Sequence, residues 1–222
     1  MNEADFLQRI QKRQSATINH RPAHPGKYPG PVRTLPDNLV DEFSRQLTAV
    51  GGHVYVVSDA ASAQRQLGAI VEELRRDGND AATAVVTGHA ILRDLELDAL
   101  LSRLDVAAYT IPHASFLVQN ADLGLTGAEY AVAASGTIAM AASSHHPRSA
   151  SLLPPIHIAV IRQEQLLPDL AALAERIRHD FPERPSSGFA LITGPSRTAD
   201  IEQTLSIGVH GPGKLYVMML SS

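Results

Sequence analysis

The chain has 222 residues, a formal net charge of -4, no Cys and no Trp. Hydrophobic residues make up 44% of it and charged residues 19%, which is ordinary for a folded domain and excludes disordered, collagen-like and coiled-coil chains. The acidic balance and the few aromatic side chains argue against nucleic-acid binding, and the lack of Cys excludes thiolate nucleophiles, disulfides and Cys-bound iron–sulfur clusters.

The first 36 residues are set apart by their proline content. Residues 3–13 are expected to form a short helix, whereas residues 20–36 hold five prolines and are predicted to be an irregular arm. The N-terminus lacks a signal-peptide pattern, and no apolar run is long enough for a membrane helix. We therefore expect a cytoplasmic protein with an arm at residues 1–36 and one domain at residues 37–222.

From residue 37 onward, helical periodicity alternates with short β-rich runs. The stripe that begins at Leu39 predicts a helix ended by Gly51 and Gly52, and Ser58 or Asp59 is expected to cap a second one. Further helices are expected around residues 94–102, 166–177 and 197–207. The predicted strands are residues 53–57, 83–86, 106–110, 156–161, 189–193 and 215–220.

The middle of the domain has a different pattern. Residues 130–133 and 137–141 are two short β-prone runs separated by Ser135 and Gly136, which predicts an antiparallel hairpin. The other strands are continuously apolar, as strands covered on both faces are. We predict an α/β fold: a mostly parallel sheet flanked by helices, with an inserted β-hairpin.

The strongest local motif is GPSRTADIE, which follows a predicted strand and is expected to open a helix. A helix N-terminus at the carboxyl end of a strand favours anions, and the Arg guanidinium can hold a carboxylate at two points. The alternative is that these residues only cap the helix. The candidate anion loop consists of Gly194, Pro195, Ser196, Arg197, Thr198 and Asp200.

Six further residues are candidates for a pocket: Glu129, Ser135, Gly136, Thr137, His210 and Gly211. The hydroxyls of Ser135 and Thr137 equally suit a turn that satisfies its own backbone. His210 lies in a Gly-rich turn that does not match a dinucleotide-binding fingerprint. No motif identifies a catalytic residue.

The ten histidines do not follow a metal-binding spacing. His145 and His146 are adjacent and would point in different directions on a strand, and His157 in its apolar strand reads as a hydrogen-bonded core residue. We therefore predict no metal site, and no cofactor is identified.

Three segments together, NADLGLTGAEYAVAASGTIAM, SLLPPIHIAV and GPSRTADIEQTLSIGVHGPGKLYVMML, resemble the LUD-domain family, in particular its lactate utilization branch. The resemblance covers about residues 38–220. It implies a fold similar to the NagB/RpiA/CoA-transferase group. Members usually read Ala-Glu-Thr-Gly-Thr where this chain has Ala134 in place of the Glu, so the carboxylate expected there is lost.

The resemblance also implies a function and partners. The family is associated with oxidation of L-lactate to pyruvate, together with the iron–sulfur lactate utilization proteins A and B. Because this chain has no Cys, it is expected to act as an accessory subunit that binds an anionic small molecule or a partner and carries no redox centre. The alternative is a stand-alone enzyme acting on a phosphorylated or CoA-linked small molecule.

Overall fold

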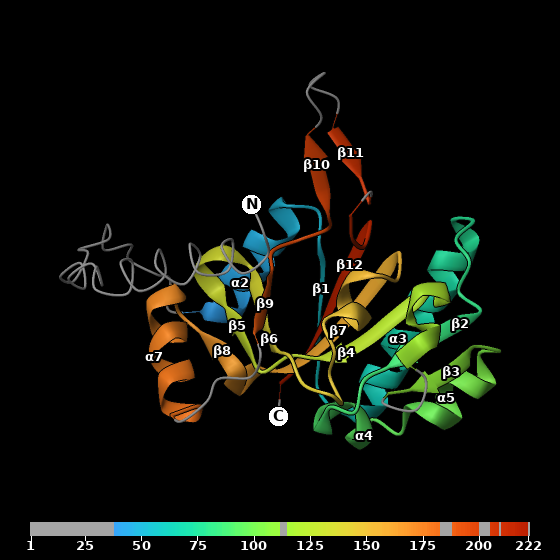
Figure 1. Ribbon diagram of the computed structural model, residues 1–222, viewed down its shortest axis with the longest axis horizontal. Helices are drawn as coiled ribbons and strands as arrows, with labels where there is room; N and C mark the ends of the chain where they lie inside the picture. Colours follow the sequence, from blue (N-terminus) through green and yellow to red (C-terminus); the bar gives the residue numbers. More distant parts are fainter. Residues whose placement is uncertain (1–37, 112–114, 183–187, 200–204, 209, 222) are drawn as a thin grey trace, which may run out of the picture. The chain divides into compact units, whose positions relative to one another are not determined.

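The computed structural model describes residues 38–111, 115–182, 188–199, 205–208 and 210–221 (Figure 1). The chain divides into two units, residues 1–34 and 35–222. Only the second is described, so the predicted N-terminal helix and proline arm lie outside the described residues. Within the described part, no helix is both long and apolar enough to cross a membrane.

The larger sheet has six strands in the order β1-β12-β7-β4-β2-β3, and every neighbouring pair is parallel. Its strands are β1 (His53–Val57), β2 (Thr83–Val86), β3 (Ala107–Thr110), β4 (Leu123–Gly127), β7 (Ile156–Arg162) and β12 (Lys214–Leu220). The two longest, β7 and β12, lie side by side near the centre and are almost wholly buried. The predicted mostly parallel sheet is confirmed.

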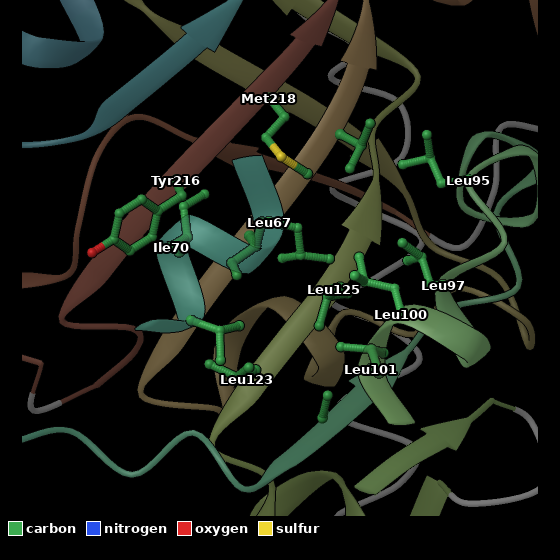
Figure 2. Packing of buried hydrophobic residues seen from close by; sticks show 14 of the residues in the cluster. Leu67, Ile70, Leu95, Leu97, Leu100, Leu101, Leu123, Leu125, Tyr216 and Met218 are labelled. Atoms are coloured by element: carbon green, nitrogen blue, oxygen red, sulfur yellow. The ribbon is translucent and has the colours of Figure 1, made fainter. Parts of the chain in front are cut away.

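One face of this sheet is covered by helices α3 (Ala60–Arg76), α4 (Ala90–Asp94) and α5 (Leu97–Arg103). Helix α3 is capped by Asp59, whose side chain accepts a hydrogen bond from the Ser62 N–H and forms a capping box with Ser62. Figure 2 shows how the leucines of α3 and α5 pack against strand residues such as Leu125 and Met218. This is the larger hydrophobic core, and it packs these helices against the sheet that carries the loops described below.

The opposite face is covered by a second sheet of four strands in the order β8-β5-β6-β9 and by helix α2 (Leu39–Ala49). Its strands are β5 (Tyr130–Val132), β6 (Thr137–Ala141), β8 (Leu166–Leu167) and β9 (Phe189–Ile192). Strands β5 and β6 form the predicted antiparallel hairpin, joined by the 3-10 turn η2 (Ala133–Ser135) and by Gly136 with φ 61°. A Cβ at Gly136 would overlap the backbone of α2, so Gly is needed at this turn.

The remaining helices pack against one or the other of the two sheets. Helix α7 (Leu170–Asp180) packs on the outer face of the second sheet through Leu173. Helix α6 (Ser149–Leu152) and the 3-10 helix η1 (Ser115–Asn120) contact the larger sheet around β4 and β2. A short 3-10 turn, η3 (Gln163–Gln165), connects β7 to β8.

Two sequence predictions need correction. Residues 189–192 form a strand as expected, but β9 pairs antiparallel with β6 in the second sheet and not with the parallel strands. The predicted helix over residues 197–207 is wrong. The described residues there are strands β10 (Arg197–Ala199) and β11 (Leu205–Ile207), which pair antiparallel (Figure 1).

The strands prevail because both ends of the segment are tied together. The Gly208 N–H donates to the Ser196 carbonyl, and the Ser196 N–H donates to the Pro212 carbonyl. These bonds continue the β10–β11 ladder toward β12. Ile201 and Leu205, four positions apart in the sequence, favour a helix. This non-local pairing outweighs that local preference.

Candidate functional site

The carboxyl edge of the parallel sheet brings together three titratable side chains from separate loops. His89 follows β2, Glu129 follows the neighbouring strand β4, and His146 lies in the loop between β6 and α6. The close approach of His89 depends on Gly127, where a Cβ would overlap the imidazole ring. Ligands of open α/β sheets bind at this kind of edge.

The distances within this trio are short. Glu129 Oε1 lies 3.6 Å from His89 Nε2 and 4.0 Å from His146 Nδ1, and all three atoms lie within 4.8 Å of one another. Glu129 Oε2 accepts a 2.6 Å hydrogen bond from the Ala141 N–H, which fixes the carboxyl group. The two imidazole rings meet edge to face, with centroids 5.6 Å apart. We call His89, Glu129 and His146 the edge triad.

Burial shifts the protonation of all three groups toward the neutral form. It raises the pKa of Glu129, an effect partly offset by the Ala141 hydrogen bond. It lowers the pKa of His89, with smaller effects from the charges of Arg93 and Arg162, and lowers the pKa of His146 to about 4. Both imidazoles are therefore neutral at pH 7.

His89 and Glu129 of the edge triad line a cavity of about 400 Å³, which we call the edge pocket. Its far side carries Tyr130, whose hydroxyl donates a 2.6 Å hydrogen bond to Asp180, and Arg176, whose Nε donates to the same carboxylate at 2.8 Å. Its remaining lining residues are Glu164, Gln165 and Leu167. Among these lining residues the one cation, Arg176, is already paired with Asp180.

A fourth polar group, His157, lies deeper, on β7. It is fully buried, and its Nε2 is 2.8 Å from the Thr126 hydroxyl on β4. Burial, with a smaller effect from His146, lowers the pKa of His157 to about 3. Its Nδ1 has no hydrogen-bond partner within the described part of the chain. The prediction of a hydrogen-bonded core histidine is therefore confirmed for Nε2 of His157 but not for Nδ1.

His157 also lines a second cavity of about 210 Å³, which we call the loop pocket. Gly194 and Ser196 of the predicted anion loop line it together with His210 and Gly211 of the Gly-rich turn. Its other lining residues are Ser151, Leu152, Leu191, Ile192, Thr193, Pro212 and Leu215. Four of the residues singled out from sequence are therefore neighbours around one pocket.

The rest of the predicted anion loop is arranged differently. The Arg197 guanidinium donates a 2.6 Å hydrogen bond to the Val50 carbonyl at the end of α2 and does not line the loop pocket. Because a strand and not a helix follows Pro195, the expected attraction of a helix N-terminus is not available. The side chain of Thr198 and all of Asp200 lie outside the described residues.

The predicted hydroxyl turn connects to the loop pocket indirectly. Ser135 Oγ lies 2.7 Å from Thr137 Oγ1, which lies 2.7 Å from Thr193 Oγ1 on the pocket wall. The neighbouring Ala134, at the position of the family's usual Glu, is half-buried in turn η2, and its N–H donates to the Pro168 carbonyl. Glu129 lies apart from this turn, in the edge triad.

Sequence reasoning did not single out His89, and it set His146 aside because its neighbour is also His. One signal was present: His89 and Glu129 each come two or three residues after a β-rich run, TAVV and LGLTG. Polar residues that follow neighbouring parallel strands share one edge of the sheet. His146 lacked such a signal because it lies in an irregular loop.

A family model described as the LUD domain matches residues 40–220. The chain belongs to the LUD domain family. The match spans both sheets and includes the edge triad and the residues of the loop pocket.

Curated relatives agree with this assignment. The chain is 36% identical over 121 residues to lactate utilization protein C of Halalkalibacterium halodurans, covering 52% of this chain and 53% of that protein. It is 36% identical over 105 residues to the Bacillus subtilis protein of that name, covering 46% and 44%. These matches span about half the length of each relative. The Anoxybacillus flavithermus protein of that name aligns over 97% of this chain and 98% of its own length, at 25% identity.

A solved structure has the same fold. The crystal structure of a DUF162 family protein from Deinococcus radiodurans superposes with a TM-score of 0.52 at 25% identity, covering 82% of this chain and 96% of that one. The LUD domain of this chain is therefore an α/β domain with a mostly parallel sheet, as its sequence predicts.

Proposed function

We infer that this chain is an accessory subunit of a system that oxidises L-lactate to pyruvate, in which it binds a small anionic molecule and carries no redox centre itself. Membership of the LUD family and similarity to proteins named lactate utilization protein C support the pathway. The lack of Cys supports the accessory role, since an iron–sulfur cluster held through Cys must belong to another chain.

The main support for a bound ligand is the environment of His157 in the loop pocket. Its Nδ1 is buried and has no partner among the described residues, although buried polar atoms are normally hydrogen-bonded. Ser196 and His210 bring further polar groups to the same cavity. A small hydroxy acid would satisfy the imidazole and these groups by hydrogen bonds, without needing the Arg197 charge.

The size of the loop pocket also favours a small ligand. Its volume of about 210 Å³ is below the range of roughly 300–1,000 Å³ that is usual for drug-sized ligands. A molecule with a handful of heavy atoms, such as lactate or pyruvate, suits this space better than an acyl-CoA.

Exposed leucines around the loop pocket support a protein partner. Leu152 and Leu191 line the pocket yet are 42% and 53% exposed, and the adjacent Leu153 is 54% exposed. Large apolar side chains gathered at one place on a surface are typical of contact sites. The partners implied by the family are the iron–sulfur lactate utilization proteins A and B.

The proposal is tested in the native host and with the purified full-length chain. Deletion of its gene is expected to abolish growth on L-lactate but not on glucose, and a tagged chain is expected to recover iron–sulfur proteins. Leu191→Asp is expected to lose these companions, whereas the exposed-histidine variant His145→Ala keeps them. Normal growth on L-lactate after deletion contradicts the proposal.

The ligand is tested separately by calorimetry with L-lactate and pyruvate, using D-lactate as the stereochemical control. A ligand present at 100 times its dissociation constant adds about 2.7 kcal/mol to the free energy of unfolding, which raises the melting temperature measurably. His210→Ala and Ser196→Ala are expected to reduce this stabilisation. No stabilisation by either compound would remove the loop pocket from the proposal.

One observation favours the alternative of a stand-alone enzyme: the edge pocket, at about 400 Å³, is larger than the loop pocket and is lined by two titratable members of the edge triad, His89 and Glu129. A thermal-shift screen with sugar phosphates and CoA esters distinguishes the two functions. Stabilisation by one of these, but not by lactate or pyruvate, would favour the enzyme.

A further inference from the structure

The edge triad combines two imidazoles and one carboxylate from three loops, with their nearest nitrogen and oxygen atoms directed at one another. Two His and one Glu or Asp are a recurrent ligand set for divalent transition metals in sites that keep an open position for water or substrate. We propose that His89, Glu129 and His146 bind one divalent transition-metal ion, such as Zn²⁺. This goes beyond the proposed function, which does not involve a metal.

The spacing of the three atoms fits a single ion. Atoms that each lie about 2.1 Å from a tetrahedral zinc ion are about 3.4 Å apart. The measured separations of 3.6 Å and 4.0 Å from Glu129 Oε1 exceed this only slightly, and no separation in the triad exceeds 4.8 Å. Small side-chain rotations therefore bring all three atoms to bonding distance.

The second observation is the state of His146. The residue is only 5% exposed, and neither ring nitrogen has a hydrogen-bond partner within the described residues. Leaving a buried polar atom unsatisfied costs about 1–3 kcal/mol. A metal ion bound at Nδ1 gives one of these two nitrogens a partner and so removes part of this cost.

Glu129 is held in a suitable orientation. The Ala141 N–H fixes its Oε2 atom at 2.6 Å, so that Oε1 remains directed at the two imidazoles. Ligating carboxylates commonly have such a backbone bond to their second oxygen, which sets their orientation. The lowered pKa values of both histidines also keep the rings in the neutral form that metals require.

Coordination has a defined consequence for His89. In the structure its Nδ1 accepts a 3.3 Å hydrogen bond from the Ile91 N–H, which places the ring proton on Nε2. Binding a metal through Nε2 moves that proton to Nδ1, so the contact with Ile91 is given up. Helix α4 keeps its other N-terminal bond, from the Leu92 N–H to the His89 carbonyl at 3.1 Å.

The chemistry of the ligand set decides the class of ion. Imidazole nitrogen suits Zn²⁺, Fe²⁺ and Cu²⁺, whereas Mg²⁺ and Ca²⁺ prefer sites built from oxygen atoms. Three protein ligands leave at least one coordination position open. The edge pocket, which His89 and Glu129 line, has room for water or an oxygen-bearing ligand beside two of the proposed metal ligands.

The test uses the tag-free, full-length chain treated with a chelator and then titrated with Zn²⁺ by calorimetry. One ion per chain with a dissociation constant in the micromolar range or tighter is expected. Substitution of Co²⁺ is expected to give visible d–d absorption bands, a readout independent of any activity. Millimolar or weaker binding, or bands typical of the hexaaqua ion, would overturn the proposal.

Matched variants locate the ion. Glu129→Gln retains an acceptor for the Ala141 N–H, and His89→Asn retains a helix-capping side chain, so both are expected to fold. Each is expected to weaken Zn²⁺ binding at least tenfold, as is His146→Gln. His145→Ala, which removes the adjacent exposed histidine, is expected to bind as the wild type does. Unchanged affinity in Glu129→Gln and His89→Asn means that the ion binds elsewhere and contradicts the site.

Discussion

The Nε2 atom of His157 on β7 lies 2.8 Å from the hydroxyl of Thr126 on the neighbouring strand β4, in a region without solvent exposure. His157 lines the loop pocket, and His146 of the edge triad is near enough to influence its charge. Polar side chains thus extend from the carboxyl edge of the sheet into the apolar layer between the two sheets.

The burial of His157 predicts an acid-sensitive fold. Its pKa is lowered from 6.5 to about 3, so between these pH values the unfolded chain binds more protons than the folded one. The free energy of unfolding of the metal-free protein is therefore expected to fall by a few kcal/mol as the pH decreases from 6.5 to 3.

Urea denaturation across this pH range measures the effect. His157→Gln keeps a partner for Thr126 but does not titrate, so its pH dependence is expected to be shallower than that of the wild type. Equal slopes for the two proteins would show that His157 does not cause the acid sensitivity.

Gly136 is predicted to be among the least replaceable glycines of the domain. Its φ of 61° disfavours any side chain, and an added Cβ would overlap the backbone at Gln46 and Leu47 of α2. Gly78 is a matched control, because its φ is 77° but nothing lies within 4 Å of an added Cβ. Gly78→Ala is expected to cost about 1–2 kcal/mol, and Gly136→Ala about 2 kcal/mol or more beyond that. Similar losses in both variants would refute the packing argument.

Arg197 is expected to stabilise the fold and not to bind the ligand. Its guanidinium is exposed and donates to the Val50 carbonyl. Arg197→Lys should therefore lower the free energy of unfolding by about 1 kcal/mol or less and leave the affinity for L-lactate unchanged. Calorimetry and thermal denaturation of the same preparation separate the two effects. A tenfold loss of affinity with an unchanged melting temperature would instead restore Arg197 to the ligand site.

Tyr130 is predicted to control the charge of Asp180. The hydroxyl of Tyr130 is the largest cause of the lowered pKa of Asp180, which is about 2, while its own pKa is raised to about 12 by burial and by this bond. In Tyr130→Phe, the pKa of Asp180 is expected to rise toward its usual value of 3.8. Carboxyl-carbon NMR titration measures it, and Tyr55→Phe is a control without this contact. An unchanged pKa in Tyr130→Phe would assign the effect to Arg176 and His179.

Local patterns in the sequence predict most of the individual elements. The cap at Asp59, the stop at Gly51 and Gly52, and the turn at Gly136 are each fixed by the backbone preferences of the residues concerned, so they are legible without a structure. The continuously apolar β7 and β12 likewise indicated a sheet covered on both faces.

Pairings between strands that are distant in the sequence cannot be predicted from local patterns. Strand β9 is as apolar as a central strand, yet its partner is β6 of the hairpin, some fifty residues earlier. Residues 197–199 form a strand only because residues 205–207 return beside them. Such choices depend on which edges are available in three dimensions, and local propensity does not contain that information.

The dependence on strand pairing also explains which parts of the candidate sites the sequence predicts. Gly194 and Ser196 come from a recognisable motif, and the structure places them beside His210 and Gly211. The edge triad has only the weak signal that His89 and Glu129 each follow a β-rich run, because the pairing of β2 with β4 is what brings them together. Their common location becomes visible only when the strand order is known.

The position of β12 between β1 and β7 has a consequence for the newly made protein. Strand β1 pairs only with β12 in the described sheet, although about 160 residues separate them in sequence. While the ribosome is still producing the intervening segments, β1 has no neighbour and its hydrogen-bonding edge is open. Emerging chains with unpaired strands are prone to associate wrongly, so this domain is expected to depend on chaperones until residues 214–220 have been translated.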